Sequence, residues 1–456
     1  MIASSLSAYI QPGKRVHLIG IGGASMTPLA KALKDAGLVV TGSDMTQSVS
    51  TDYLQEAGIP VFIGHEPKNI DGAEFIVRTA AAREENLEIQ AARANGTPVF
   101  ERAEAWGHIM RQYKHAVCIA GTHGKTTTTS MAAHILLAAG SDPTIMIGGT
   151  LPKLQTGHRV GRGDTIVLES CEYYNSFHNF APTVAVVLNV EEDHLDYFND
   201  LDEIKTSFGT FAGLTPPDGT IVANGDDENT MSALSGLGRP LLTFGLDAAN
   251  RVHAENIVRC GTRTMFDIMV DGAHYTNVTL CLPGDYNIKN ALAAASVAFA
   301  LDLPPDAVRE GLSDFIGVDR RFTYKGKRDG VDIYDDYAHH PTELHVLFDA
   351  VEALDYKRIL VAFQPHTYTR TYALFDDFAA ALSRPDLMFV AEIFAAREKN
   401  TVGITAKDLA AKIPNAQHFE NLESLADALH EQMRSGDLLI TVGAGDIYKV
   451  GEILLG

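Results

Sequence analysis

Cysteine is scarce in this sequence: the 456 residues include four, Cys118, Cys171, Cys260 and Cys281, and no two of them form a Cys-x-x-Cys pair. Neither a disulfide framework nor a cysteine-based zinc site is therefore indicated. Long apolar runs are missing too, because none approaches the roughly 18 residues that a membrane-spanning helix needs. The N-terminus has no charged segment followed by an apolar one. We expect a cytoplasmic protein without membrane insertion.

Basic residues are also few relative to acidic ones. Lysine and arginine number 37 against 58 aspartates and glutamates, so the formal net charge is −21. Such a chain would repel nucleic acid and anionic membranes, and neither is expected as a partner. An anionic substrate must then be held by a locally positive site. The rest of the composition, 46% hydrophobic and 21% charged, is that of an ordinary globular protein, and the length predicts about two to four domains.

What the sequence does contain is a strong phosphate-binding signal in segment 118–131, CIAGTHGKTTTTSM. The apolar run HAVCIA reads as a buried strand, and a helix is expected from Lys125 onward. Unpaired N–H groups and the helix dipole make such a helix start suitable for polyphosphate. Lys125 would reach the β- and γ-phosphates, and the Thr126 hydroxyl would ligate Mg²⁺. The candidate nucleotide ligands are Gly121, Thr122, His123, Gly124, Lys125, Thr126 and Thr127.

This loop departs from the general pattern, because two residues rather than four separate its glycines. A plain glycine turn with a surface lysine is the alternative. We expect the Lys125 side chain to face solvent when no nucleotide is bound.

The N-terminal segment 15–44 reads as strand, glycine turn, helix and strand, with the second strand ending at Asp44. This is the opening of a dinucleotide-type fold, in which Asp44 would meet a ribose hydroxyl. Ser25, however, stands where the third glycine of the fingerprint belongs. Nicotinamide or flavin binding, binding of another nucleotide, and a purely structural turn all remain open. The candidate ligands of the turn are Gly20, Gly22 and Gly23.

Two strands of the central region end in side chains suited to a metal. Glu169 lies in the strand expected at 165–170, and His194 lies in EEDHLDYF, after the strand expected at 183–190. Ligands of α/β proteins bind at the C-terminal ends of parallel strands, the edge that also carries the phosphate loop. Mg²⁺ prefers oxygen ligands, although one histidine among them is workable. The alternatives are a solvated glutamate and a helix-capping histidine.

Three segments between residues 251 and 282 predict an antiparallel meander, and a helix then starts near Asn287 and Asn290. Asparagine at a helix start is commonly only a cap. Two asparagines could also hydrogen-bond adenine.

Beyond residue 321, strands alternate with helices and predict a second doubly wound sheet. Single histidines are more often structural, but a cluster of histidines with an arginine at strand ends favours a site. The polar residues that follow the strands are Asp336, Tyr337, His339 and His340, then His366 and Arg370, and finally the GAGD sequence at 443–446.

Together these motifs resemble the Mur ligase family along the whole chain. The matching segments, in order, are GIGGASM, GSD, RAE at Arg102–Glu104, GTHGKTTTT, E-x-x-E at Glu169–Glu172, NVEEDHLDYF, LPGDYNIKNALAA, VDRRF, YDDYAHHPTE, FQPHTYTRT and GAGDI. So many motifs in one order are highly specific. The shortened phosphate loop is itself the form that this family uses.

The resemblance implies an α/β protein of three domains. These are a Rossmann-like domain over 1–112 that binds a UDP-sugar, a central P-loop ATPase-like domain with a mixed sheet over 113–321 that binds ATP, and a Rossmann-like doubly wound domain over 322–456 that binds an amino acid. The N-terminal turn would then hold UDP diphosphate rather than NAD.

The resemblance also implies an activity. The motifs are most similar to those of members that join L-alanine to the carboxylate of UDP-N-acetylmuramate, with ATP and Mg²⁺ and through an acyl phosphate, in peptidoglycan precursor synthesis. A sister ligase that attaches a tripeptide to the same sugar is the nearest alternative. An NAD-dependent oxidoreductase and a nucleotide-sensing protein without turnover are alternatives from other classes.

Residue roles carried over from the family are implied in the same way. The resemblance assigns phosphate and metal to Lys125 and Thr126, metal to Glu169 and His194, ATP to Asn287, Asn290, Arg321 and Asp336, and the sugar carboxylate with the incoming amino acid to His339, His340, His366 and Arg370. Positioning and charge neutralisation would dominate catalysis, with His366 as a candidate base for the amine.

The chain departs from its relatives at one strand end. Many relatives read E-A-D-E-S-D there, whereas this chain reads E-S-C-E-Y-Y, with Cys171 and Tyr174 in place of aspartates. We expect no metal role in that motif beyond Glu169. Sister ligases also use a modified lysine after the metal histidine, and Lys205 does not lie at that spacing.

Overall fold

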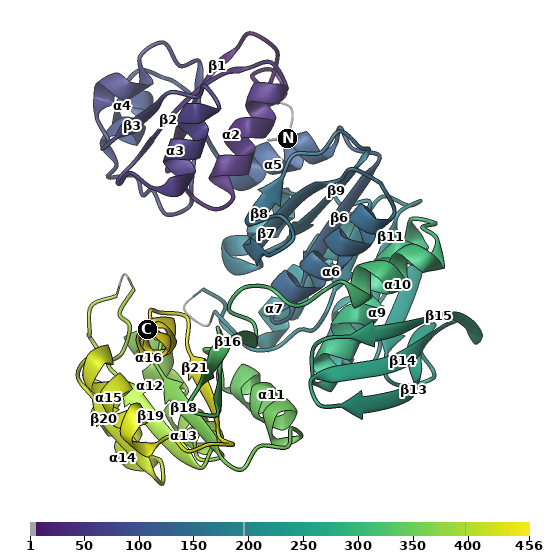
Figure 1. Ribbon diagram of the computed structural model, residues 1–456. Coiled ribbons are helices and arrows are strands. Elements are labelled where there is room, and N and C mark those ends of the chain that lie inside the picture. Colours follow the sequence, from purple (N-terminus) through teal and green to yellow (C-terminus); the bar gives the residue numbers. More distant parts are fainter. Residues whose placement is uncertain (1–5, 195–196, 397) are drawn as a thin grey trace. The chain divides into compact units, whose positions relative to one another are not determined.

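The computed structural model describes residues 6–194, 197–396 and 398–456. Its strands form three sheets of five, ten and six strands (Figure 1). The chain divides into two compact units, the first comprising Met1–Glu255, Asp267–Val278 and Lys289–Asp314, and the second Asn256–Phe266, Thr279–Ile288 and Phe315–Gly456. Among the described residues, no helix combines the length and the apolar character that crossing a bilayer requires.

The N-terminal sheet is parallel, with strand order β3-β2-β1-β4-β5. Residues 16–19 of β1 are buried, as expected for a parallel strand covered on both faces. This order is Rossmann-like, as predicted. The elements are β1 (Arg15–Ile19), α2 (Met26–Asp35), β2 (Val39–Asp44), α3 (Val49–Glu56), β3 (Val61–Ile63), η1 (Pro67–Ile70), β4 (Phe75–Arg78), α4 (Leu87–Ala94), β5 (Val99–Glu101) and α5 (Arg102–Met110).

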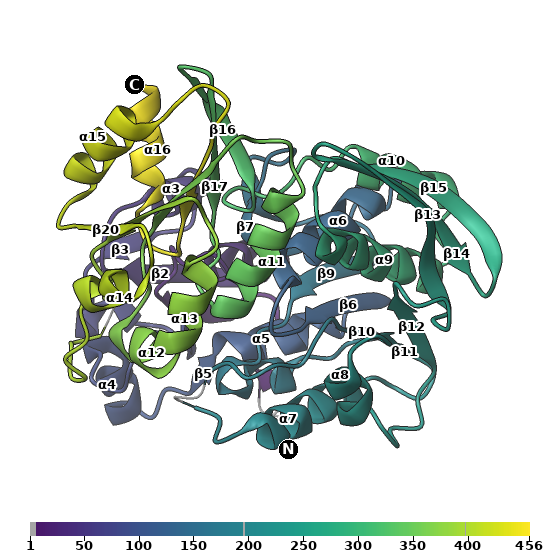
Figure 2. The same ribbon diagram turned by 90° about the horizontal axis from the view of Figure 1, so that it is seen from below.

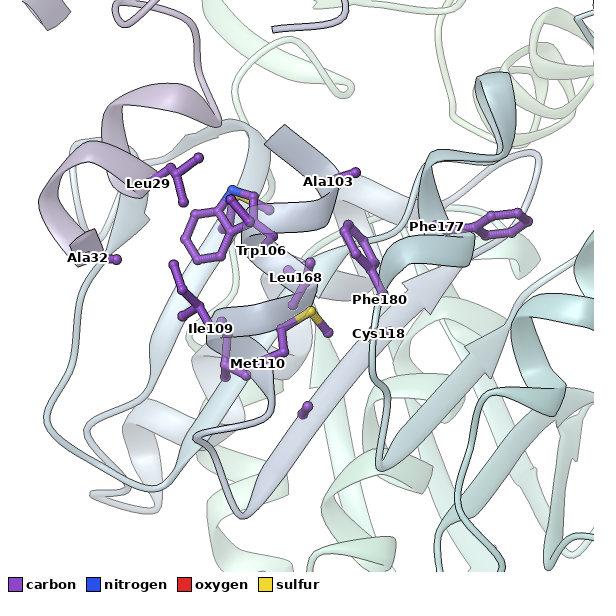
Figure 3. Packing of buried hydrophobic residues seen from close by; sticks show 14 of the residues in the cluster. Leu29, Ala32, Ala103, Trp106, Ile109, Met110, Cys118, Leu168, Phe177 and Phe180 are labelled. Carbon is purple, nitrogen blue, oxygen red and sulfur yellow. The ribbon is translucent and has the colours of Figure 1, made fainter. Parts of the chain in front are cut away.

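One apolar core continues from this sheet into the central region. Trp106 of α5 is 1% exposed and donates its indole N–H to the Ser25 carbonyl at 3.1 Å. Figure 3 shows its ring next to Leu29 of α2. Gly107 allows a close approach, because a Cβ there would lie 1.8 Å from the carbonyl oxygen of Asn179. The tryptophan and the glycine thus fix α5 against both the N-terminal helix layer and the central region.

The central sheet has the strand order β15-β14-β13-β12-β11-β10-β6-β9-β7-β8. The predicted strand HAVCIA is β6, which lies between β10 and β9 and is parallel to both. The C-terminal ends of these three strands therefore meet at one edge of the sheet. β8 is antiparallel to β7, so the sheet is mixed, as predicted.

The elements of this region are β6 (His115–Ala120), α6 (Lys125–Ala138), β7 (Thr144–Leu151), β8 (Thr156–Arg159), β9 (Thr165–Glu169), η2 (Tyr173–Asn179), β10 (Val184–Val187), α7 (Leu201–Gly213), β11 (Thr220–Asn224), α8 (Glu228–Ala233), β12 (Leu241–Gly245), β13 (Val252–Cys260), β14 (Arg263–Val270), β15 (Ala273–Leu280), α9 (Asp285–Ala300) and α10 (Pro305–Ser313).

The C-terminal sheet has the order β16-β17-β21-β18-β19-β20, with β16 antiparallel to β17 and the other pairs parallel. Its two faces are buried in separate cores. Val361 and Phe363 of β18 lie in the core with α11, α13 and α14, whereas Leu360 and Ala362 lie in the core with α15 and α16. Figure 2 shows α15 and α16 apart from α11 and α13. The predicted doubly wound sheet is confirmed.

The elements of the C-terminal sheet and its helices are β16 (Thr323–Arg328), β17 (Val331–Asp336), α11 (Pro341–Glu352), β18 (Ile359–Phe363), α12 (Tyr368–Ala373), α13 (Phe375–Leu382), β19 (Leu387–Ala391), α14 (Ala406–Lys412), β20 (Ala416–Phe419), α15 (Leu422–Gln432), β21 (Leu438–Val442) and α16 (Tyr448–Leu455). The last strand, β21, is wholly buried between β17 and β18.

Candidate active site

The phosphate loop joins β6 to α6 through two glycines that no other residue could replace without a shift. Gly124, the N-cap of α6, has a left-handed φ of 84°, and a Cβ on it would lie 2.7 Å from Asn290 Oδ1. Gly121 has a φ of 153°, and a Cβ on it would lie 2.8 Å from Leu188 Cβ. The loop therefore brings backbone, rather than side chains, to the start of the helix.

The start of α6 suits an anion. Its first turn has no acidic residue, and no side chain caps it. The segment after β10 holds the loop in place: the Asn189 side chain accepts the His123 N–H at 2.8 Å, and the Asn189 carbonyl accepts the Thr122 N–H at 3.2 Å. Thr127 is buried and Thr126 half-buried in the first turn of α6. These contacts shape the loop before any ligand arrives.

Lys125 does not face solvent, so that expectation was wrong. Its Nζ donates to the carbonyls of Gly121 and Thr122, the latter at 3.1 Å, and lies 3.0 Å from Glu172 Oε2. The Lys125 side chain is 17% exposed and that of Glu172 only 3%. Burial alone would lower the pKa of Lys125, but the charge of Glu172 and the neighbouring Glu169 outweighs it and the pKa is raised. The lysine thus stays charged.

Three side chains at the same edge could hold a divalent cation. Glu172, Asp193 and His194 each offer a ligand atom, and these atoms lie within 4.8 Å of one another. His194 Nε2 is 3.9 Å from Glu172 Oε1 and 3.8 Å from Asp193 Oδ2. Two carboxylates and one imidazole fit Mg²⁺, which prefers oxygen donors and completes its shell with water or phosphate oxygens.

Sequence reasoning did not name Asp193, and it set Glu172 aside, because no metal role was expected in that motif beyond Glu169. Glu172 is the second glutamate of the E-x-x-E motif, and Asp193 directly precedes His194, so both were visible in motifs already quoted. The structure brings together His194 with Glu172, whereas Glu169 Oε1 accepts the Gly148 N–H at 2.6 Å. Glu169 and Thr126 as metal ligands stay predictions.

In the N-terminal turn, Asp44 has a clear local role. Its Oδ2 accepts the Gly22 N–H at 2.8 Å, so the carboxylate fixes the turn. Gly20 has a left-handed φ of 78°, and a Cβ there would lie 2.5 Å from Thr79 Cγ2. Ser25, the residue in place of the third glycine, accepts a hydrogen bond from Arg102 through its hydroxyl. The turn therefore has a cation next to it that the glycine pattern did not reveal.

In the second unit, three of the four predicted substrate residues lie close together: His339 and His366 follow strands, and Arg370 belongs to α12. The rings of His339 and His366 lie 5.8 Å apart, edge to face, and His366 stacks on Phe394 at 5.8 Å. Burial lowers the pKa of both imidazoles, to about 4 for His366, and the neighbouring cation of Arg370 adds to the effect. Both rings are therefore neutral near pH 7.

His340 has a different position from its neighbour. It is the N-cap of α11, and its Nδ1 accepts the Thr342 N–H at 3.3 Å. The contact that we predicted between His340 and substrate stays a prediction.

Asp336 is buried at the end of β17 and accepts the N–H groups of Phe322 and Ala338, each at 2.7 Å. Burial raises its pKa to about 6. The guanidinium of Arg321 lies over the Tyr337 ring, 5.2 Å from its centroid. The carboxylate thus ties the segment before β16 to the loop after β17, and it positions the residues predicted to meet phosphate.

The two asparagines of α9 are both buried. Asn290 Oδ1 accepts the Thr128 hydroxyl at 3.1 Å, which links α9 to α6. Asn287 Nδ2 donates to the Pro283 carbonyl at 2.7 Å. Their roles in ATP binding stay predictions.

Two further residues hold the GAGD loop after β21. Arg320 donates to the carbonyls of Gly443 at 2.6 Å and Gly445 at 3.0 Å. Gln364, which follows β18, accepts the Asp446 N–H at 2.8 Å. Both residues lie in matching motifs, VDRRF and FQPHTYTRT, but their contacts join segments at least 82 residues apart, which a motif does not show.

Comparison with known proteins gives consistent matches over these regions. Three family models match: "Mur ligase family, catalytic domain" over residues 15–114, "Mur ligase middle domain" over 119–298 and "Mur ligase, glutamate ligase domain" over 320–445. UDP-N-acetylmuramate–L-alanine ligase of Clostridium novyi is 43% identical over 446 residues, covering 97% of each chain. The protein of the same name from Agathobacter rectalis is 43% identical over 449 residues, covering 96% of this chain and 97% of the relative.

A solved structure of a protein with the same named activity also matches this chain. The crystal structure of UDP-N-acetylmuramate-alanine ligase MurC from Thermotoga maritima matches with a TM-score of 0.80 and 28% identity, covering 97% of this chain and 98% of that one.

Proposed function

The chain belongs to the Mur ligase family, and from this premise we propose that it joins L-alanine to the carboxylate of UDP-N-acetylmuramate at the expense of ATP. The observation that carries the proposal is the 43% identity, over 97% of the chain, to a protein named for that reaction. The product is a peptidoglycan precursor. We place the reaction in the cytoplasm, because it consumes ATP and a UDP-sugar. The tripeptide-attaching and oxidoreductase alternatives are not favoured.

We assign the UDP-sugar to residues 1–112, ATP to 113–321 and alanine to 322–456. The glycine turn held by Asp44, with the Arg102 cation beside it, supports the first assignment. The uncapped start of α6 supports the second. The neutral histidines beside Arg370 support the third.

The chemistry starts from an unreactive group. Resonance and negative charge make a carboxylate carbon a poor electrophile, so the γ-phosphoryl group is first transferred to a carboxylate oxygen, with ADP leaving. The alanine nitrogen then attacks the carbon of the acyl phosphate. The tetrahedral intermediate collapses, the C–O bond to phosphate breaks, and the amide remains. One amine proton must be taken up during the attack.

Lys125 supplies positive charge next to the transferring phosphoryl group. Its ammonium is paired with Glu172, so a contact between Lys125 and the triphosphate would compete with this carboxylate for the same charge. Mg²⁺, held by Glu172, Asp193 and His194 with Glu169 and Thr126 as further candidates, would supply additional positive charge to the phosphates. From the family resemblance, we also assign Arg321 a contact with phosphate.

The amine requires a proton acceptor. His366 has its pKa lowered to about 4, so its imidazole is unprotonated at neutral pH and can accept a hydrogen bond or a proton. Arg370 offers a planar guanidinium fork for a carboxylate. His339 Nδ1 lies 3.4 Å from the Glu343 carboxylate, and the charge of Arg370 lowers the pKa of His339. We assign these residues to the alanine and sugar carboxylates.

Phosphate release tests the proposal. The full chain should release phosphate when ATP, UDP-N-acetylmuramate and L-alanine are all present, and the rate should fall to background when any one is omitted. A tripeptide that outperforms alanine would favour the sister reaction. Phosphate release that ignores both sugar and amino acid would contradict the proposal.

A further inference from the structure

The histidine of the candidate metal group is covered on one face by an aromatic ring. Tyr173 and His194 are stacked, with ring centroids 4.4 Å apart and an interplanar angle of 28°. Tyr173 directly follows Glu172 in the chain, so one short segment supplies both a carboxylate and the surface on which the imidazole rests. The aromatic residues belong to the strand-end sequence E-S-C-E-Y-Y that departs from the acidic pattern.

A second layer supports Tyr173. Tyr197 meets its ring edge to face at 6.2 Å, with an angle of 80°. The Tyr197 hydroxyl accepts a hydrogen bond from Asn175 Nδ2 at 2.9 Å, and Asn175 Oδ1 accepts one from the Ser207 hydroxyl at 2.5 Å. Ser207 is buried in α7. A continuous line of contacts therefore runs from α7 to the imidazole of His194.

Backbone conformation points to the same cluster. Tyr174, Asn175 and His194 all have left-handed φ values of 53°. Residues other than glycine adopt this conformation at an energetic cost, and they persist where surrounding contacts over-determine them, often at functional sites. Here Tyr174 and Asn175 lie in η2, which directly follows Glu172, and His194 is itself a member of the candidate metal group.

We propose that Tyr173 is a positioning residue, whose ring fixes the His194 imidazole so that its Nε2 stays directed at the carboxylates of Glu172 and Asp193 for divalent-cation binding. The inference rests on the metal assignment made in the proposed function. Histidine ligands of metals are usually oriented by a hydrogen bond to the second ring nitrogen. Stacking on Tyr173 restricts the ring of His194, because rotation of this 23% exposed side chain away from the carboxylates would break the contact between the two ring faces.

Titration of the nucleotide-free full chain with Mn²⁺, followed by electron paramagnetic resonance, measures the effect directly. Tyr173→Leu should weaken Mn²⁺ binding by about 10-fold or more, the size seen when the groups around a metal ligand are altered. Tyr173→Phe keeps the ring and should stay within about twofold of wild type, since the inference rests on the ring face. Equal Mn²⁺ affinity for wild type and Tyr173→Leu would overturn the proposal, and so would equal losses in the Leu and Phe variants.

Tyr174→Leu is the matched control. Tyr174 contacts the rings of Tyr173 and Tyr197, and its own side chain is largely solvent-exposed. Its loss should leave Mn²⁺ affinity near wild type. A loss equal to that of Tyr173→Leu would assign the effect to general loosening of the cluster and would refute the positioning role. Thermal unfolding of all variants without metal shows whether each one is folded.

Failure of the metal assignment itself gives a different result. His194→Ala should weaken Mn²⁺ binding at least as much as Tyr173→Leu. If His194→Ala binds Mn²⁺ like wild type while losing no ligase activity, the metal site has been misplaced. If His194→Ala weakens binding and Tyr173→Leu does not, only the positioning role fails. In the ligase assay, Tyr173→Leu should raise the Mg²⁺ concentration for half-maximal rate more than it lowers the rate at saturating Mg²⁺.

Discussion

Replacing Lys125 should damage stability and activity together, and a second substitution should separate the two. The Lys125 ammonium lies 3.0 Å from the Glu172 carboxylate, whose side chain is 3% exposed. Lys125→Met keeps most of the aliphatic stem and removes the charge. It leaves a buried carboxylate without its cation and with Glu169 in the same neighbourhood. Breaking a buried pair from one side costs about 3–5 kcal/mol, and the partial exposure of Lys125 places the expected loss near 3 kcal/mol.

The double variant Lys125→Met/Glu172→Gln should recover most of that stability, because a neutral amide no longer needs a cation. Ligase activity should not recover, since the charge at the transferring phosphoryl group is still missing. Scanning calorimetry without nucleotide follows stability, and phosphate release with all three substrates follows activity. The single variant Glu172→Gln completes the double-mutant cycle, together with wild type, Lys125→Met and the double variant.

Three results would refute this reasoning. Near-normal turnover by Lys125→Met would show that the loop lysine does not serve the phosphoryl group. Unfolding of Lys125→Met at the wild-type temperature would show that the pair with Glu172 contributes nothing to stability in solution. A double variant less stable than Lys125→Met would also contradict the pairing.

Four further outcomes are expected. Arg370→Ala should lower alanine turnover roughly 100-fold while ATP affinity stays the same, because the guanidinium fork orients a carboxylate for attack; unchanged turnover would mean that the alanine site is elsewhere. His366 has its pKa lowered from 6.5 to about 4 in the folded chain. The unfolded state then binds the proton more tightly, stability falls as pH drops from about 6.5 toward 4, and His366→Gln should flatten that slope in thermal unfolding. Calorimetric titration of the full chain should detect UDP-N-acetylmuramate and not NAD, and tight NAD binding would reverse the assignment of the N-terminal turn. Glycine and serine should be used poorly but detectably in place of alanine, because one methylene group is worth about 1–3 kcal/mol, and rates across an amino-acid panel check this.

Buried strands were predictable because their apolar runs are short and bounded. HAVCIA is β6 residue for residue, and the strand at 165–170 is β9 to within one position. The strand expected at 183–190 ends at Val187 instead. The residues after it turn away to hold the phosphate loop, with Asn189 accepting from His123. An apolar run in the sequence does not show where the strand ends and the following residues begin to contact a loop distant in sequence.

The candidate site was predictable where one motif contains the chemistry and less so where two motifs meet. The sequence indicated the phosphate loop, but the Glu172 partner of Lys125 lies 47 residues further along. Nothing local marks that pair, so a lysine that looked solvent-facing is largely buried. Adjacent histidines show the same limit: His340 caps α11, whereas His339 faces His366. The two histidines are adjacent in sequence, but the backbone conformation directs their side chains to different contacts.

The place of β21 in the C-terminal sheet has a consequence for biosynthesis. This strand is the last in the chain, yet it lies between β17 and β18, pairing Asp332–Asp336 with Leu438–Val442. At synthesis rates of about 5–20 residues per second, the chain between β17 and β21 takes roughly 5–20 seconds to appear. During that time the nascent sheet lacks its central strand, and the helices that will cover it have no complete surface to pack against. A ribosome that stalls before residue 438 would therefore present a chain that has every strand of the first two sheets but lacks a central strand of the third, the kind of exposed apolar intermediate that chaperones and proteases recognise.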